Sequence, residues 1–168
     1  MLKPGDIVTQ TKTMINKVNF DDNKENRLSV VLFSYVDKND ELYYCTVPIT
    51  NTTKNVYSKL ISQNHVYMPN AILNSTKLCC AKINSIYLYK NEDVKSTGLS
   101  LEKDLIYRIY NKILGLEVDE VRQELYNFIK IMINDNIARE KRELKKEHKE
   151  KQKIKRLKSK ELKNNYKK

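Results

Sequence analysis

Apolar and polar positions divide the chain into a β-type region followed by a helical region. Continuous apolar runs cover Leu28–Val36 and Leu42–Ile49, and the polar turn Asp37–Asp40 lies between them. Runs of this length that contain β-branched residues predict buried strands, and the short turn predicts that the two strands pair as a hairpin. An earlier strand is predicted from Gly5 to Thr13, directly after a Pro-Gly turn.

Weaker strand signals follow the hairpin. Short strands are predicted at Tyr57–Ile61 and Val66–Tyr67, and the aromatic and β-branched segment Cys79–Tyr89 predicts a last strand. Pro48, near the end of the second hairpin strand, suits an edge or bulge position because proline has no N–H to donate. Several short strands separated by turns are typical of a small barrel or sandwich.

The periodicity changes to that of a helix after the last predicted strand. Ser100 is a candidate N-cap, an apolar stripe runs from Leu101 to Leu114, and Gly115 predicts the helix end. A second amphipathic helix is predicted to begin near Val118 or Asp119. The predicted fold is therefore mainly β with C-terminal helices, in the α+β class. The expected parts are a barrel with its helix at 1–116, a second helix at 117–138 and a basic tail at 139–168.

The charge is concentrated in that tail. Residues 139–168 contain 15 Lys and Arg against 5 Asp and Glu, a net charge of +10, whereas residues 1–138 contain 17 basic and 16 acidic residues. The tail, helical or disordered, therefore supplies any long-range attraction for a polyanion. One interpretation is a solvated segment, and another is a salt-sensitive clamp on RNA or DNA phosphates.

Several protein classes do not fit this composition. No apolar run approaches the length of a membrane span, and the N-terminus lacks the apolar core of a signal peptide. The three cysteines, of which Cys79 and Cys80 are adjacent, do not form a disulfide framework, and two histidines are too few for a zinc site. We expect a cytoplasmic protein with buried cysteines, no metal site, no cofactor and no membrane contact.

One pair of residues carries candidate chemistry. Arg27 stands where a polar segment enters the first hairpin strand, and Thr50 stands where the second hairpin strand ends. A guanidinium suits a phosphate group, and a hydroxyl can orient a reacting group, so a phosphodiester could lie between them. The alternative is a solvated arginine and a turn-forming threonine.

An ordered set of segments resembles the PemK/MazF family of bacterial toxins. The segments are Gly5-Asp6-Ile7-Val8, then Arg27 with Val30-Val31-Leu32, then Val47-Pro48-Ile49-Thr50, with a weaker continuation through Cys80–Ile86 and Gly98–Ser100. The resemblance covers about residues 3–114. It implies an SH3-like small β-barrel with a C-terminal helix, usually paired as a homodimer.

The resemblance also implies an activity. Members are metal-independent, sequence-selective endoribonucleases that cleave single-stranded RNA and are neutralised by a cognate antitoxin protein. In this chain it assigns catalysis to Arg27 and Thr50, which would activate the 2′-hydroxyl and stabilise the transition state, leaving a cyclic phosphate and a 5′-hydroxyl end. Candidate RNA contacts precede and follow these two residues, at Lys17, Asn19, Asn26, Asn51 and Lys54.

Two other functions stay open. Leu28 follows Arg27 where the family usually has proline. A catalytically inactive barrel that binds nucleic acid through the basic tail is therefore an alternative to the toxin. A third is a structural protein whose long helix docks another chain.

Overall fold

The computed structural model of the protein describes residues 1–10, 28–51, 64–68, 79–117 and 120–165, with the backbone alone at 51, 120–122 and 159–165. Contacts divide the chain into two compact units, Met1–Lys130 and Ile131–Lys168. The first unit contains an antiparallel sheet, the helix α3 and the beginning of the helix α4. The second unit contains the remainder of α4. The protein is therefore an α+β protein, as the sequence predicted.

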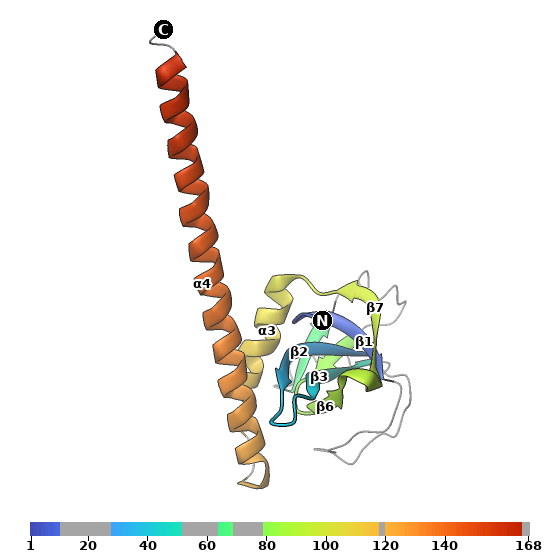
Figure 1. Ribbon diagram of the computed structural model, residues 1–168. Coiled ribbons are helices and arrows are strands. Elements are labelled where there is room, and N and C mark those ends of the chain that lie inside the picture. Colours follow the sequence, from blue (N-terminus) through green and yellow to red (C-terminus); the bar gives the residue numbers. More distant parts are fainter. Residues whose placement is uncertain (11–27, 52–63, 69–78, 118–119, 166–168) are drawn as a thin grey trace. The chain divides into compact units, whose positions relative to one another are not determined.

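The sheet has seven described strands (Figure 1). They are β1 (Asp6–Gln10), β2 (Leu28–Val36), β3 (Leu42–Asn51), β4 (His65–Met68), β5 (Cys79–Lys82), β6 (Tyr87–Lys90) and β7 (Val94–Ser100). The strand order is β4-β5-β3-β2-β1-β7, and β6 also pairs with β3. Among the described strands this order has two ends, β4 and β7, so their pairing does not close a barrel.

The hairpin of β2 and β3 confirms the strongest sequence prediction. Strand β2 has the predicted bounds, Leu28–Val36, and Val30, Val31 and Leu32 are fully buried. The turn is held by the Asp37 carboxylate, which accepts the main-chain N–H groups of Asn39 and Glu41 at 2.9 Å each. Aspartate is frequent at such turns because its side chain satisfies nearby backbone donors.

The predicted strand Cys79–Tyr89 is instead two strands. A turn at residues 83–86 separates β5 from β6, and the N–H of Ser85 donates to the carbonyl of Lys82 at 3.1 Å. Strand β5 pairs with Ile49–Asn51 of β3, and β6 pairs with Tyr43–Thr46. Strand β6 therefore lies along the first half of the long strand β3, and β5 lies along its second half. The turn at residues 83–86 lets the chain change direction between these two pairings.

Pro48 lies between these two pairings. Of the predicted edge or bulge position, the edge alternative was wrong, because β3 is a central strand of the described sheet. The described pairing of β3 with β6 ends at Thr46, and the pairing with β5 begins at Ile49. Proline is tolerated here because its missing N–H falls in the interval where β3 has no described partner on that side.

Strand β7 was not predicted. Its sequence, VKSTGLS, is mostly exposed and lacks the apolar alternation of a strand. It forms because it pairs with β1, and the Thr97 hydroxyl donates to the carbonyl of Ile7 at 2.7 Å. Ser100 ends β7 opposite Asp6 and is not the N-cap of a helix. Helix α3 (Lys103–Leu114) begins after Glu102 and ends at Gly115, which confirms the predicted C-cap.

Helix α3 covers one face of the sheet (Figure 1). Ile109 and Ile113 are fully buried, and the Tyr110 hydroxyl donates to the carbonyl of Leu32 at 2.5 Å. A separate apolar cluster collects side chains from β1, β2, β3, β6 and β7. Its buried members are Val8, Val31, Tyr44, Tyr87, Tyr89 and Val94.

Helix α4 runs without a break from Glu120 to Asn165. Its first turns belong to the sheet unit, where Phe128 makes edge contacts with Phe33 and Tyr35 at ring-centroid distances of 6.3 and 5.5 Å. Lys130 donates to the carbonyl of Leu116 at 2.9 Å. The predicted second helix and the described part of the basic tail thus form one continuous helix, and the helical alternative holds for the tail through Asn165.

Candidate functional site

Five strand ends meet at one rim of the sheet. In an antiparallel sheet, the end of one strand lies beside the beginning of the next. The described registers place the ends of β1, β3 and β4 beside the beginnings of β2 and β5. We call this edge the loop rim and define it by Gln10, Leu28, Thr50, Met68 and Cys79. Three connecting segments, 11–27, 52–63 and 69–78, are joined to the chain at this rim.

Two of the predicted site residues lie on the loop rim itself. Thr50 is half-buried in β3 and pairs with Cys80 of β5. Asn51 ends β3 opposite Cys79, and its side chain is not described. The hydroxyl of Thr50 is thus at the strand end where the sequence predicted it.

The other predicted site residues lie outside the described residues. They are Arg27, Lys17, Asn19, Asn26 and Lys54. Arg27 directly precedes Leu28, the first residue of β2, and Ser29 of β2 pairs with Pro48 of β3. The first four belong to the segment that joins β1 to β2, and Lys54 belongs to the segment that follows β3. Both segments are joined in the sequence to residues of the loop rim.

A buried polar pair that the sequence did not reveal ties two strands together at this rim. The Gln10 side-chain amide donates to the Ser29 hydroxyl at 2.5 Å, and both side chains are buried. Buried polar groups are stable when they satisfy each other, so this bond links the end of β1 to the beginning of β2. The sequence signal was slight, because glutamine at a strand end reads as a solvated residue.

The cysteines do not supply a nucleophile at this rim. Cys45, Cys79 and Cys80 are free and buried, which confirms the expectation of buried cysteines. Burial raises the pKa of the Cys45 thiol far above its ordinary value, because the thiolate is poorly solvated there. The thiolate is the reactive form of cysteine, so Cys45 is an inert packing residue.

A second set of groups with shifted pKa values lies at the opposite end of the β2–β3 hairpin. Lys90 and Glu41 form an ion pair at 2.8 Å, which lowers the pKa of Glu41 and raises that of Lys90. The Tyr43 hydroxyl donates to Glu41 at 2.7 Å, and this bond raises the pKa of Tyr43. The main-chain N–H of Glu41 lowers the pKa of Asp37. These groups hold the turn together and lie on the surface, so we interpret them as structural.

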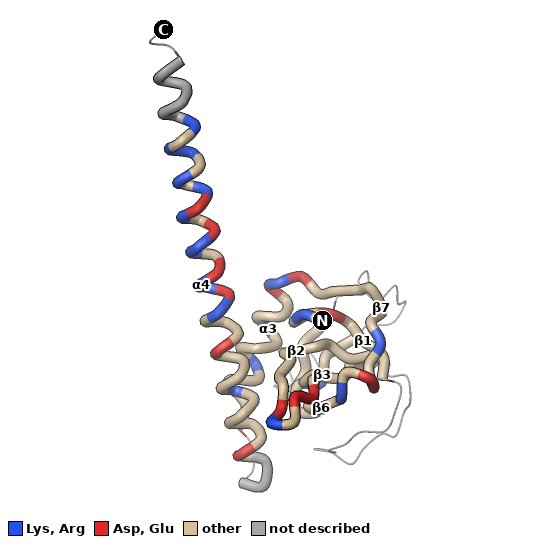
Figure 2. Tube along the Cα trace, viewed as in Figure 1, with Lys and Arg blue, Asp and Glu red and all other residues tan. Residues whose placement is uncertain are grey.

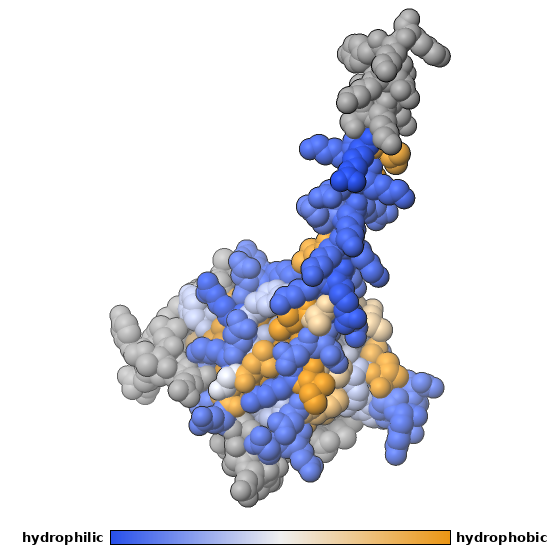
Figure 3. All heavy atoms as spheres, turned by 90° about the vertical axis from the view of Figure 1, so that its left-hand side faces the viewer, coloured by the Kyte–Doolittle hydropathy of each residue, from blue (hydrophilic) through white to orange (hydrophobic). Residues whose placement is uncertain are grey.

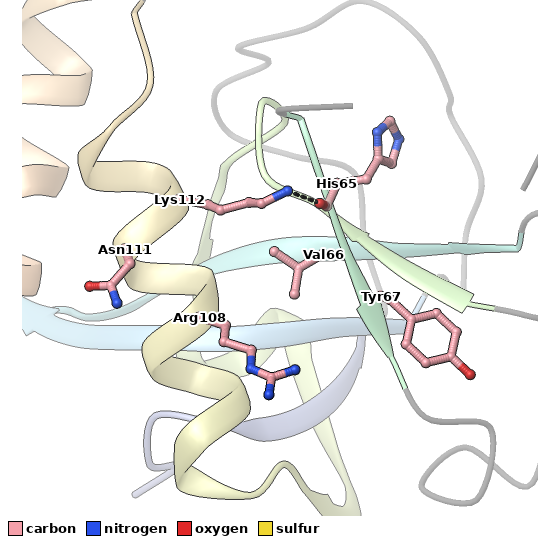
Figure 4. Close-up of a pocket in the computed structure, with 6 residues that line it drawn as sticks. All are labelled: His65, Val66, Tyr67, Arg108, Asn111 and Lys112. Atoms are coloured by element: carbon pink, nitrogen blue, oxygen red, sulfur yellow. Dashed lines mark hydrogen bonds between the residues drawn. The ribbon is translucent and has the colours of Figure 1, made fainter. Parts of the chain in front are cut away.

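A second polar feature of the sheet unit is a groove between α3 and the edge strand β4 (Figure 4). Its volume is about 330 Å³, and it is lined by His65, Val66, Tyr67, Arg108, Asn111 and Lys112. The Lys112 ammonium donates to the carbonyl of His65 at 2.8 Å. The sequence analysis did not select these residues. The available signal was the pair of cations Arg108 and Lys112, which stand four residues apart on the polar face of a predicted helix.

The outer part of α4 carries closely spaced charges of both signs (Figure 2). Glu140, Glu143, Glu147 and Glu150 are spaced by three or four residues, so they form one stripe along the helix. A set of lysines spaced by four residues lies on the opposite side, at Lys141, Lys145, Lys149 and Lys153. Figure 3 shows the hydrophilic side chains that surround this part of the helix, and Leu144, Ile154 and Leu157 are about half exposed.

Two kinds of feature do not occur among the described residues. No helix among them is long and apolar enough to cross a membrane. Within the same part of the chain, no three His, Cys, Asp or Glu side chains gather closely enough to hold a metal ion.

Comparison with models of known protein families finds no match, and comparison with curated proteins finds none either. These comparisons assign no family to the chain.

Proposed function

We propose that the protein is a metal-independent, sequence-selective endoribonuclease of the PemK/MazF type that cleaves single-stranded RNA at the loop rim. The observation that carries this proposal is the position of Thr50. Its hydroxyl stands on the rim from which the segments holding Arg27 and the other candidate RNA contacts depart. The segments that contain the other candidate residues thus leave the described sheet at the same edge as Thr50.

The proposed reaction needs one cation and one orienting hydroxyl. The RNA 2′-oxygen attacks the adjacent phosphorus as its proton leaves, and the bond from phosphorus to the 5′-oxygen breaks. The products are a 2′,3′-cyclic phosphate and a 5′-hydroxyl, which receives a proton. Arg27 stabilises the charge that develops on the phosphate oxygens, and Thr50 positions the reacting phosphodiester. Lys17, Asn19, Asn26, Asn51 and Lys54 hold the neighbouring nucleotides.

The proposal includes an SH3-like barrel for the sheet unit. A single buried cluster draws side chains from β1, β2, β3, β6 and β7, although β1 and β6 are not neighbours in the strand order. Register irregularities between β2 and β3 and between β1 and β7 favour the same curvature, because bulges increase the bend and twist of a sheet. Following the family pattern, we propose a homodimer that a cognate antitoxin neutralises in the cytoplasm.

The test is cleavage of a long unstructured RNA by the purified full-length protein in EDTA. We expect discrete fragments with 5′-hydroxyl ends from the wild type. The Arg27→Ala variant should lose cleavage by about a hundredfold or more, because removal of a single group that stabilises the transition state has an effect of this size. The Thr50→Ala variant should lose a smaller factor in cleavage, since the Thr50 hydroxyl orients the substrate without carrying charge.

The matched control is Lys38→Ala, which removes an exposed cation from the hairpin turn at the opposite end of the sheet. It should cleave as the wild type does. Intact RNA with the wild type, at concentrations where the protein binds RNA, would show that the protein is not a ribonuclease.

The charge pattern of α4 favours a second candidate function, nucleic-acid binding without cleavage. Lysines four residues apart repel one another and destabilise a helix by about 0.2–0.5 kcal/mol per pair. The stripe from Lys141 to Lys153 contains consecutive pairs of this kind. A polyanion removes the repulsion, so the helix gains stability when it binds phosphates. In this alternative, Arg27→Ala leaves RNA affinity unchanged and removal of residues 139–168 abolishes it.

A further inference from the structure

The outer part of α4 presents cations on one side of the helix. An α-helix turns by about 100° per residue, so the direction of each side chain follows from its position in the sequence. Within residues 139–158, whose side chains the structure describes, one arc of about 140° contains no Asp or Glu. The arc holds Gln152, Arg156 and six further cations, all of them exposed. We call these six residues the basic face: Lys141, Arg142, Lys145, Lys146, Lys149 and Lys153.

The acidic and apolar side chains of this part of α4 lie outside the basic face. The four glutamates from Glu140 to Glu150 share a separate arc of about 80°. Ile154 lies within that arc, Leu157 lies beside it, and Leu144 lies between the two arcs. Ile154 and Leu157 are about half exposed. A ligand on the basic face therefore meets positive charge without carboxylates and without an apolar surface.

The basic face is wide enough to contact two rows of negative charge. Lys141 and Arg142 are consecutive residues, so their side chains leave the helix in directions about 100° apart. Lys145 and Lys146 repeat this arrangement one turn later, and Lys149 lies between the two directions. The face thus has two diverging flanks and a cation in the middle. Its length from Lys141 to Lys153 is about 18 Å at the rise of an α-helix.

We propose that the basic face binds duplex DNA, with the outer part of α4 lying in the major groove. An α-helix with its side chains is about 10–12 Å across, and the major groove of B-form DNA is about 12 Å wide. Each wall of the groove carries the phosphates of one strand, so each flank of the basic face reaches one row of phosphates. The glutamates then point out of the groove.

The contacts of this proposal are with phosphates. Phosphate contacts position a protein on a duplex but carry no sequence information, so we expect binding without sequence preference. The inference deepens the second candidate function, nucleic-acid binding through α4, and it does not require the ribonuclease reaction.

Single-stranded nucleic acid is the first competing ligand, and the composition of α4 disfavours it. Proteins that bind single strands combine cations with aromatic side chains on which the bases stack. Residues 139–165 contain no Phe, Tyr or Trp. A single strand also presents one row of phosphates, which engages one flank of the basic face, whereas a duplex groove engages both flanks.

Duplex RNA and an anionic membrane are disfavoured by shape and by the position of the apolar residues. The major groove of A-form RNA is deep and narrow, so an α-helix fits it less well than it fits B-form DNA. A helix that lies on a membrane buries an apolar face and places its cations beside that face. In α4 the half-exposed Ile154 lies among glutamates, which an anionic membrane repels.

The test measures binding of the full-length protein to a fluorescent DNA duplex of mixed sequence by anisotropy. The face variant combines Lys145→Gln, Lys149→Gln and Lys153→Gln. We expect it to weaken binding about tenfold or more at low salt. The slope of log affinity against log salt should fall in magnitude by up to about 2.7, because each phosphate contact on B-form DNA contributes about 0.9.

The matched control combines Lys151→Gln, Lys155→Gln and Lys158→Gln. These lysines are exposed on the same helix but lie outside the basic face, and their replacement changes the net charge by the same amount. We expect the control to weaken binding less than about threefold, and far-UV circular dichroism verifies that both variants keep the helix. Equal losses in the two variants would show that general electrostatics attracts the DNA, and the basic face would then be wrong.

Competition experiments test the shape of the ligand. Unlabelled duplex DNA should displace the probe better than single-stranded DNA or duplex RNA of the same sequence and phosphate concentration. Equal displacement by the single strand would overturn the groove geometry. Stronger displacement by duplex RNA would overturn the assignment to B-form DNA.

The inference and the proposed functions fail in different ways. A protein that cleaves RNA but binds duplex DNA no better than single-stranded DNA retains the ribonuclease and removes the inference. A protein that leaves RNA intact but loses duplex binding only in the face variant removes the ribonuclease and retains the inference. A protein that binds neither DNA nor RNA removes the inference together with the second candidate function.

Discussion

The sheet unit and the outer part of α4 both contain isoleucine and other apolar residues, but these side chains are buried in the sheet unit and half exposed on the outer part of α4. Ile109 of α3 is fully buried, whereas Ile154 of α4 is 48% exposed. Residues 1–138 carry almost balanced charge, and residues 139–168 carry a net charge of +10. An apolar side chain therefore stabilises this protein only where the sheet provides a second surface to cover it.

The difference separates two contributions to the proposed RNA binding. A folded sheet can hold a few groups at defined positions, as it does with Thr50 and with Lys112 beside β4. An exposed basic helix does not fix its side chains at defined positions around a ligand. Its electrostatic field nevertheless attracts a polyanion over a Debye length of about 8–10 Å. We expect the sheet unit to determine which RNA bond or nucleotide is selected and α4 to raise the affinity for any RNA.

The largest expected effect comes from a pair of matched isoleucine truncations. Ile109→Ala should destabilise the sheet unit by about 2–5 kcal/mol, because it removes buried methyl groups and leaves a cavity. Ile154→Ala should change stability by less than about 0.5 kcal/mol, because its side chain is half exposed. Urea unfolding of both variants measures the difference. Equal losses in the two variants would show that α4 is as well packed as the sheet unit.

A second comparison uses two glycines of the sheet unit that differ in their surroundings. Gly5 and Gly98 have φ angles of +97° and +76°, which side chains rarely adopt. A Cβ atom on Gly5 would lie 3.1 Å from Ile106 Cγ1 and 3.3 Å from the carbonyl oxygen of Leu101, whereas one on Gly98 meets nothing within 4 Å.

Gly98→Ala should therefore cost only the backbone strain, about 1–2 kcal/mol. Gly5→Ala should cost more, since the contact between β1 and α3 must also shift. Thermal unfolding of the two variants checks the order, and a larger loss for Gly98→Ala would contradict it.

A third experiment concerns the lysine stripe of α4. Replacement of Lys141, Lys145, Lys149 and Lys153 by glutamine should reduce RNA affinity about tenfold or more at low salt. The slope of log affinity against log salt should fall in magnitude by up to about 3, from about 0.7 per phosphate contact on a single strand. Glutamine substitution of Glu140, Glu143, Glu147 and Glu150 is the control, and it should not weaken binding. An unchanged salt slope in the lysine variant would exclude α4 as the phosphate-binding surface.

The smallest effect is expected at the hairpin turn. Asp37 and Glu41 have pKa values below their ordinary ones in the folded protein. Their stabilising contribution is therefore present above the unfolded-state pKa and is lost as the pH falls through the folded-state pKa. Amide exchange at Asn39 and Glu41 should accelerate in acid more than exchange in α3 does. The ion pairs are exposed, so the change should be local and modest.

Lys90 has the opposite dependence. Its pKa is raised by Glu41, so its contribution is present below the unfolded-state pKa and is lost as the pH rises through the folded-state pKa. The Glu41→Gln variant should remove the alkaline dependence of exchange at the turn and keep the acidic dependence that Asp37 supplies. Retention of the alkaline dependence would show that a group other than Lys90 and Glu41 controls it.

The sequence predicted the elements that depend on neighbouring residues. The hairpin of β2 and β3 and its turn were predicted correctly, because the continuous apolar runs and the polar residues between them are local signals in the sequence. The apolar stripe of α3 and its end at Gly115 were equally local. Strand β7 was not predicted, because its side chains do not show the pattern of a strand. It is a strand because its backbone pairs with β1.

The candidate site was predicted in part. Thr50 stands at a strand end on the loop rim, as its place after an apolar run indicated. Arg27 lies outside the described residues, so its side chain stays a prediction. The groove around Arg108 could not be predicted, because Lys112 and His65 are 47 residues apart in the chain and only folding joins them.

The sequence by itself determined the order of the hairpin, the helix α3 and the basic extension, and it determined where the charge lies. These properties follow from periodicity and composition, which are set by residues close together in the chain. The tertiary structure decided which strand ends form the loop rim, where Pro48 is tolerated and which cations of α3 lie beside β4. Those properties depend on strand pairing and helix packing between distant segments, and no local pattern of residues encodes them.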